Sequence, residues 1–222
     1  NYYIAVYRCN ELITRADGIK WNSEATKGTY IGEARAIRAL CYFDMVRLWE
    51  NIPLLTEPTT ENVPQAAPDE VYQLIIEDLK YAVENIPANA YPKAQAATND
   101  GHITKYAAEA LLARVYLFYS GYYGKEPANL TKAEALAAVE DVITSKEFDL
   151  VKDFKNLWPA ASVTWTANAD GSYTKTDTYA GRGNVETVLA QKFNYTSDYN
   201  GNADGNRWQV MIAPRNLLSV PY

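Results

Sequence analysis

The side chains best suited to chemistry are aromatic, and they lie in the last third of the chain. A pyranose ring has an apolar face that stacks on flat aromatic rings, and a rim of hydroxyl groups that bonds to amide, carboxylate and guanidinium groups. Both kinds of side chain occur here, with Tyr173, Tyr195, Tyr199 and Asn168 among them. We predict that a carbohydrate ligand contacts Trp165, Trp208, Arg207, Asn202, Tyr179 and Asp198.

The alternative for any single tryptophan is a structural role, because buried tryptophan is common in protein cores. In that interpretation Trp158, Trp165 and Trp208 cover the helical core as lids. The chain holds 18 Tyr, 5 Trp and 5 Phe, and most of the tyrosines are expected to pack between helices with the hydroxyl reaching water. For the aromatic set as a whole, we expect at least one ring to contact ligand.

Other catalytic and metal-binding patterns are absent from the sequence. The single histidine, His102, has no partner at metal-ligand spacing and is expected to be a surface or capping residue. There is no Cys-x-x-Cys pair, no nucleophile elbow and no phosphate-binding loop. We therefore expect no cofactor and no metal; a cation in the Asn/Asp/Gly-rich stretches 168–171 or 200–205 is the lesser alternative to ordinary turn chemistry.

Carboxylates are plentiful, and a pair of them could serve as the acid and base of a glycosidase. Glu77 and Asp78 are adjacent on a predicted helix and so point in different directions. Glu186, Asp198 and Asp204 are further candidates, but nothing in the pattern singles them out. We predict that the protein is not an enzyme.

Charge and hydropathy restrict the class of protein. A net charge of −6 over 222 residues argues against a nucleic-acid partner, whose phosphates need a basic face. No apolar run has membrane-spanning length, and no signal peptide is visible. We expect a piece of a longer protein, truncated at both ends, with its export signal upstream. Cys9 and Cys41 fall on successive predicted helices, where two buried free thiols are favoured and a disulfide is the alternative.

The first two thirds of the chain show helical periodicity. We predict helices over 2–15, 29–50, 69–86, 104–119 and 131–144, paired as helical hairpins, with the second antiparallel to the first. The predicted apolar stripe of the long helix, which Thr29 would cap, contains Ala34, Ile37, Cys41, Met45 and Leu48, and a second row contains Leu40, Phe43 and Val46. The stripe of the last helix contains Ala133, Leu136, Ala137, Glu140 and Ile143.

Capping and helix-terminating residues set the predicted ends of these helices. Pro68 suits the first helical position, Gly121 is a reasonable C-terminal stop, and Thr131 with Glu134 forms a capping box. Long helix pairs with small residues at the crossing points are typical of tetratricopeptide-like packing, although no strict repeat period is present.

After residue 150 the pattern changes. The segments 163–166 and 173–176 flank Asn168-Ala169-Asp170-Gly171, which predicts a β-hairpin. Residues 185–193 are predicted to form a strand, and residues 196–207 a long polar loop. The predicted fold is mostly α, with a tetratricopeptide-like helical scaffold over 1–150 and a loop-rich segment with short strands over 151–222, both within one domain.

Several of these segments resemble the SusD/RagB family. The resemblance is carried by Glu33-Ala34-Arg35, Ile37-Arg38-Ala39-Leu40, Tyr42-Phe43-Asp44, Val46-Arg47-Leu48-Trp49, Ile52-Pro53-Leu54, Glu57-Pro58, Val71-Tyr72, Glu77-Asp78-Leu79 and Ile86-Pro87. These are scaffold motifs, so the resemblance transfers a class, a location and a partner but no binding residue.

The resemblance implies a non-catalytic, lipid-anchored protein on the surface of the Bacteroidetes outer membrane. Such a protein binds a nutrient glycan or oligosaccharide and delivers it to a SusC-like TonB-dependent transporter. Two other classes remain open: a tetratricopeptide-like module that binds a protein or peptide, and a helical glycoside hydrolase. Ligand rings in the loops after residue 150 favour glycan, whereas a polar and aromatic groove on the helices favours peptide.

Overall fold

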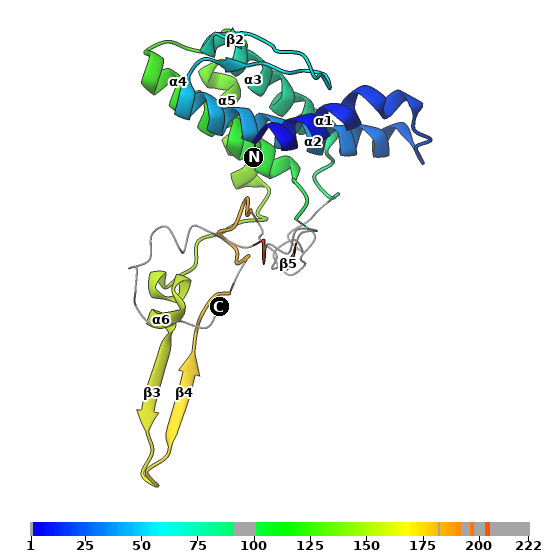
Figure 1. Ribbon diagram of the computed structural model, residues 1–222. Helices are drawn as coiled ribbons and strands as arrows, with labels where there is room; N and C mark the ends of the chain where they lie inside the picture. Colours follow the sequence, from blue (N-terminus) through cyan, green and yellow to red (C-terminus); the bar gives the residue numbers. More distant parts are fainter. Residues whose placement is uncertain (1, 91–100, 182, 192–195, 198–202, 205–222) are drawn as a thin grey trace. The chain divides into compact units, whose positions relative to one another are not determined.

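The computed structural model describes residues 2–90, 101–181, 183–191, 196–197 and 203–204. Residues 1–189 form one compact unit and residues 190–222 a second. The first unit begins with helices α1 (Tyr2–Arg15), α2 (Glu24–Trp49), α3 (Pro68–Asn85), α4 (Lys105–Tyr123) and α5 (Lys132–Thr144) (Figure 1). The mostly helical fold class predicted from periodicity is confirmed.

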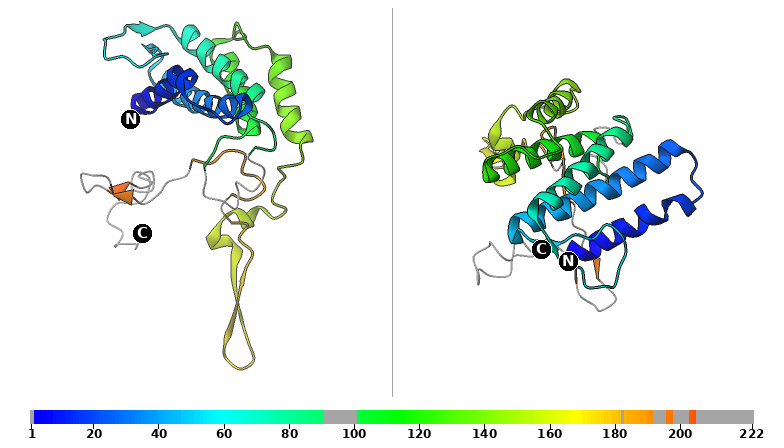
Figure 2. Two further views of the ribbon diagram at one scale, coloured as in Figure 1. Left: turned by 90° about the vertical axis from the view of Figure 1, so that its right-hand side faces the viewer. Right: turned by 90° about the horizontal axis from the view of Figure 1, so that it is seen from above.

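The five helices pack in chain order. Helix α2 contacts α1 on one side and α3 on the other, α3 contacts α4, and α4 contacts α5. Figure 2 shows α1 and α2 lying side by side and antiparallel, as the sequence predicts. Because α2 is covered on two sides, its buried residues extend around much of its circumference.

Helix α2 differs from its prediction in two respects. It begins at Glu24, where the Ser23 side chain accepts a hydrogen bond from the Thr26 amide, so Thr29 is an interior residue and not the N-cap. Ile37 and Leu48 are exposed, because contacts on two sides divide the expected single stripe.

Helices α2 and α3 approach each other closely at a glycine. A Cβ atom on Gly32 would lie 2.9 Å from Ile86 Cγ1 and 3.4 Å from the Ala82 Cα atom. Glycine at this position therefore lets the α3 backbone lie against α2, and a larger side chain would force the helices apart.

The α4 and α5 predictions are partly wrong. Helix α4 continues past Gly121 and ends at Tyr123, where Gly124 takes the left-handed conformation at φ 66°. The capping box of Thr131 and Glu134 is confirmed at the start of α5. In α5, however, the predicted stripe is not buried: among its described residues only Ala135 is buried, while Leu136 and Ile143 are exposed.

A buried polar network holds three helices together. The guanidinium of Arg38 on α2 donates from Nε and Nη2 to both carboxylate oxygens of Asp78 on α3, each at 2.7 Å. Its Nη1 donates to Asn10 Oδ1 on α1, also at 2.7 Å. The amide of Asn10 and the hydroxyl of Tyr42 then both donate to the Leu55 carbonyl. This network fixes the relative positions of α1, α2, α3 and the segment that follows α2.

Short strands and turns complete the first unit. Strands β1 (Ile52–Pro53) and β2 (Gln65–Ala66) pair antiparallel. Two short helices, η3 (Phe154–Leu157) and α6 (Pro159–Ser162), precede the antiparallel hairpin of β3 (Val163–Ala167) and β4 (Tyr173–Asp177), which confirms the predicted hairpin. The predicted strand over 185–193 is wrong for the residues described there, which form turns and irregular backbone.

The second unit contains one small ladder. Strands β5 (Thr196–Ser197) and β6 (Ala203–Asp204) pair antiparallel within the stretch predicted as a loop.

Both cysteines are buried and free, as favoured from the sequence. Burial raises the pKa of the Cys9 and Cys41 thiols to about 11 in each case, so both are held as neutral thiols.

Tyr72 offers a direct test of this core. Its side chain is buried, and its hydroxyl has no hydrogen-bond partner within the described part of the chain. Because that hydroxyl has lost its hydration without replacement, Tyr72→Phe is expected to be neutral or to stabilise the fold by up to about 1 kcal/mol. Chemical denaturation measures the effect.

The matched control is Tyr42→Phe, which removes a hydroxyl that both donates to the Leu55 carbonyl and accepts from the Leu55 amide. It should cost about 1 to 3 kcal/mol. Equal losses in the two variants would contradict the assignment of Tyr72 as the hydroxyl without a partner.

Candidate functional site

The hairpin β3–β4 presents two chemically different faces. Its register pairs Trp165 with Lys175 and Ala167 with Tyr173, so the two aromatic residues share one face. The opposite face carries the four threonines Thr164, Thr166, Thr174 and Thr176. Trp165 is 62% exposed and Tyr173 is 66% exposed. Two open rings on one face are suited to stacking against a flat apolar ligand.

The turn of the hairpin uses its own polar groups. The Asn168 side-chain amide donates to Ser172 Oγ and Thr174 Oγ1, and the Asp170 carboxylate accepts from both the amide and the hydroxyl of Ser172. These bonds lower the pKa of Asp170 below its usual range. The Asn, Asp and Gly of this stretch therefore satisfy a turn, which is the role that turn chemistry predicts.

The structure describes two of the six predicted site residues. Trp165 lies in β3, and Tyr179 follows β4, where its backbone amide donates to the Asp177 carboxylate. Trp208, Arg207, Asn202 and Asp198 lie outside the described residues. The interpretation of the tryptophans as lids does not fit Trp158 and Trp165, because their side chains are 58% and 62% exposed.

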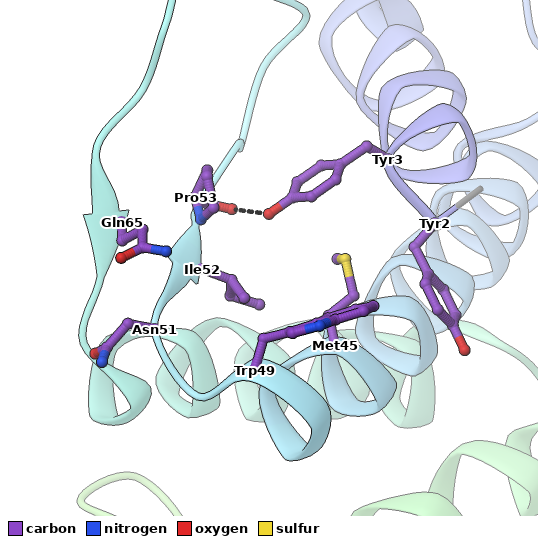
Figure 3. A pocket seen from close by; sticks show the side chains of 8 residues that line it. All are labelled: Tyr2, Tyr3, Met45, Trp49, Asn51, Ile52, Pro53 and Gln65. Carbon is purple, nitrogen blue, oxygen red and sulfur yellow. Dashed lines mark hydrogen bonds between the residues drawn. The ribbon is translucent and has the colours of Figure 1, made fainter.

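A concave site that the sequence did not reveal lies near the ends of α1 and α2. It has a volume of about 520 Å³, within the range of small-molecule sites. Figure 3 shows the Trp49 indole and the Tyr3 ring on opposite sides of this hollow, with Asn51 and Gln65 toward one end. The lining residues are Tyr2, Tyr3, Met45, Trp49, Asn51, Ile52, Pro53 and Gln65.

The pocket is aromatic and uncharged. Tyr3 donates its hydroxyl hydrogen bond to the Pro53 carbonyl at 2.9 Å, and the Tyr2 hydroxyl donates to Asp44 Oδ2 at 3.2 Å. Burial raises the pKa of both phenols, and the Asp44 carboxylate adds to the effect at Tyr2, so both rings stay neutral. Trp49 is 58% exposed and lies edge-on to Tyr2. An open indole beside two amides, which donate and accept hydrogen bonds, fits a neutral polar ligand.

Sequence reasoning missed this pocket because Trp49 was assigned to a scaffold motif. The feature that could have indicated the pocket is the position of the tryptophan. It is the last residue of α2, where a large ring has no further helical turn to pack against. Tyr2, Asn51 and Gln65 come from three different elements or loops, so no spacing in the sequence connects them.

The carboxylates weighed as catalytic candidates have structural roles where they are described. Asp78 is fully buried on Arg38, and Glu77 accepts from Gln73, so the adjacent pair does point in different directions, as predicted. Glu186 accepts from the Val151 amide. His102 is half-buried and hydrogen-bonded to Glu33 at 2.7 Å, a partner the sequence did not reveal. No cluster of three or more metal-ligating side chains occurs among the described residues.

Across the part of the chain that the structure describes, no helix combines the length and apolar character needed to cross a bilayer.

Comparison with known proteins shows which family this chain resembles. The SusD-like family described as "Starch-binding associating with outer membrane" matches residues 1–117, more than half of the chain. A SusD-like protein of Bacteroides ovatus is 31% identical over 169 residues, covering 71% of this chain and 29% of that protein.

Solved structures show the same similarity. A structure with xylogluco-oligosaccharide superposes with a TM-score of 0.64 at 25% identity, covering 90% of this chain and 36% of that one. A laminarin-binding SusD-like protein superposes with a TM-score of 0.59 at 26% identity, covering 77% of this chain and 38% of that one. The chain thus spans about a third of the length of these relatives, and it belongs to the SusD-like family.

Proposed function

We propose that this chain is part of a non-catalytic glycan-binding protein. In this proposal the protein is a lipoprotein on the outer face of the outer membrane, and it delivers oligosaccharide to a SusC-like TonB-dependent transporter. The observation that carries the proposal is the family match over residues 1–117, together with relatives whose names state xylogluco-oligosaccharide and laminarin as ligands.

The open aromatic face of the hairpin supports binding by stacking. Trp165 and Tyr173 lie on one face of paired strands, and neither stacks on another aromatic ring of the described residues. The apolar face of a pyranose can lie on Trp165, while the neighbouring Lys175 ammonium can donate to hydroxyl oxygens. Tyr179 remains part of the proposed surface, as do Trp208, Arg207, Asn202 and Asp198. Capture needs no covalent chemistry, since stacking and hydrogen bonding to a neutral glycan are sufficient.

A second candidate function is favoured by the pocket. A polar and aromatic groove on helices is typical of peptide recognition, and the pocket at Trp49 lies against the ends of α1 and α2. The two functions are compatible, because a glycan surface on the hairpin leaves the pocket available for a segment of a protein partner.

Affinity electrophoresis tests the proposal. The protein is run through gels that contain different neutral polysaccharides, alongside Trp165→Ala, Trp49→Ala and the control Trp158→Ala. Trp158 is 58% exposed and lies before the hairpin. We expect one polysaccharide to retard the protein without release of reducing sugar, and Trp165→Ala to weaken binding at least tenfold, about 1.4 kcal/mol.

The outcomes separate the candidates. Relief of retardation by Trp165→Ala alone assigns glycan to the hairpin and leaves the pocket for a peptide, whereas relief by Trp49→Ala places glycan in the pocket. Release of reducing sugar would identify a glycoside hydrolase and overturn the proposal. If all three variants were retarded as strongly as the unsubstituted protein, none of these rings would form the glycan surface.

A further inference from the structure

Two carboxyl groups and one ammonium group meet where α5 packs on α4. Lys105 Nζ lies 2.6 Å from Asp141 Oδ2 on α5 and 3.3 Å from Glu109 Oε1 on its own helix. The Glu109 side chain is only 4% exposed, whereas the Asp141 side chain is 45% exposed. A single ammonium ion therefore neutralises one of two negative charges, and the buried carboxylate bears the larger desolvation cost.

The second oxygen of Glu109 has no partner. Oε2 is buried, and no hydrogen bond reaches it within the described part of the chain. The Asp141 and Glu109 carboxyls lie next to each other, because both contact the same Lys105 ammonium group, at 2.6 and 3.3 Å. Two ionised carboxylates are both acceptors and repel each other, but one proton placed between them supplies the missing donor.

We propose that Glu109 and Asp141 share one proton, and that this proton holds the C-terminal half of α5 against α4. The proposal is independent of glycan binding. It assigns a proton-binding site to residues outside both aromatic surfaces.

The direction of the pKa shifts agrees with this geometry. Burial, followed by the neighbouring Asp141, raises the pKa of Glu109 to about 7, above its usual value of 4.5. The Lys105 ammonium, followed by the Glu109 carboxyl, lowers the pKa of Asp141. The proton therefore stays on Glu109, and the protonated carboxyl donates a hydrogen bond to the Asp141 carboxylate. On α3, the element that packs on the other side of α4, Lys80 is bound to Glu134 at the start of α5.

The effect on stability follows from these shifts. Between pH 4.5 and about 7 the folded chain binds more protons at Glu109 than the unfolded chain does. The stabilisation from this carboxyl is therefore complete below about pH 4.5 and is lost as pH rises through about 7. Asp141 contributes in the opposite sense, but only near and below its usual pKa of 3.8.

The two halves of α5 should respond differently. The first half is anchored by the buried Leu130 and Ala135, and by the capping box. Asp141, in the second half, depends on the contacts with Lys105 and Glu109. Loss of the shared proton should therefore loosen residues 139–144, while the amides of Glu134 and Ala135, which donate to Thr131, stay protected.

Carbon-13 NMR of the carboxyl groups, with amide hydrogen exchange across α5, tests the proposal on the whole chain. We expect the Glu109 carboxyl to titrate near pH 7. Exchange at residues 139–144, corrected for intrinsic rates, should quicken by at least roughly tenfold as the proton is lost, because each unit by which folding raises the pKa corresponds to a factor of ten. Glu109→Gln supplies a permanent donor and should remove this pH dependence. Glu140→Gln changes an exposed carboxylate on the same helix and should leave it intact.

Asp141→Asn keeps the test decisive if Glu109→Gln fails to fold. An asparagine amide can donate to ionised Glu109, so the titration midpoint of Glu109 should fall by about one unit or more. A wild-type Glu109 that titrates near 4.5, or a midpoint unchanged by Asp141→Asn, would overturn the proposal.

Discussion

Replacing Arg38 with Met is expected to lower the free energy of unfolding by about 3 to 5 kcal/mol. Arg38 and Asp78 are 3% and 0% exposed, and the substitution would leave the Asp78 carboxylate and Asn10 Oδ1 buried without their donor. Arg35 Nη1 lies 3.7 Å from Asp78 Oδ1, but it cannot reproduce the two-pronged geometry of Arg38. Urea denaturation followed by circular dichroism measures the loss.

Two further variants identify the cause of the stability loss in Arg38→Met. Arg15→Met removes an exposed arginine paired with Glu11 and should change stability by less than about 0.5 kcal/mol. Adding Asp78→Leu to Arg38→Met should recover part of the loss, because the buried unpaired charge is then gone. If Arg38→Met behaved like Arg15→Met, the network would not hold α1, α2 and α3 together.

Phe43→Ala is expected to cost about 3 to 5 kcal/mol, because it removes a fully buried ring and leaves a cavity. Phe43 is 1% exposed and meets Tyr72 of α3 and Phe118 of α4 edge to face, at centroid distances of 6.3 and 5.8 Å. The Arg47 guanidinium lies 4.2 Å from its ring centre. One side chain on α2 therefore contacts both of the following helices.

The matched control is Phe154→Ala. Phe154 is 72% exposed and contacts Trp158 on the short helices before the hairpin. Its loss should change the unfolding free energy by less than about 0.5 kcal/mol. A similar loss in both variants would mean that Phe43 is not the packing centre between α2, α3 and α4.

The helices could be predicted from the sequence where a local signal fixes them. Pro68 opens α3, and the capping box of Thr131 and Glu134 opens α5, because both act through backbone geometry within one turn. The stripes of α2 and α5 were less predictable. Periodicity gives the apolar positions but not how many neighbours cover them, so Leu48 and Ile143 were expected inside and are exposed.

Contacts between distant residues were beyond sequence reasoning. Arg38 binds Asp78, which lies 40 residues away in the sequence, so no local spacing connects the two residues. The pairing of Asp44 with Arg47, by contrast, joins residues three apart on one helix, a local geometry that sequence spacing can indicate. The pocket at Trp49 was missed for the same reason as the Asp78 contact: its lining residues come together only when α1 and the β1–β2 ladder are placed.

Fluorine NMR with 5-fluorotryptophan tests the central claim most directly, because each of the 5 tryptophans gives its own signal. Single Trp→Phe variants assign the signals. The protein is then titrated with an oligosaccharide fragment of the neutral polysaccharide that retards it most in gels. Glycan binding predicts a saturable shift of the Trp165 signal, with Trp49 reporting whether the pocket takes part. The Trp21 signal should stay constant, since that ring stacks on Tyr30 and donates to the Ala16 carbonyl. A titration in which neither the Trp165, the Trp49 nor the Trp208 signal moves would contradict glycan binding by these aromatic side chains.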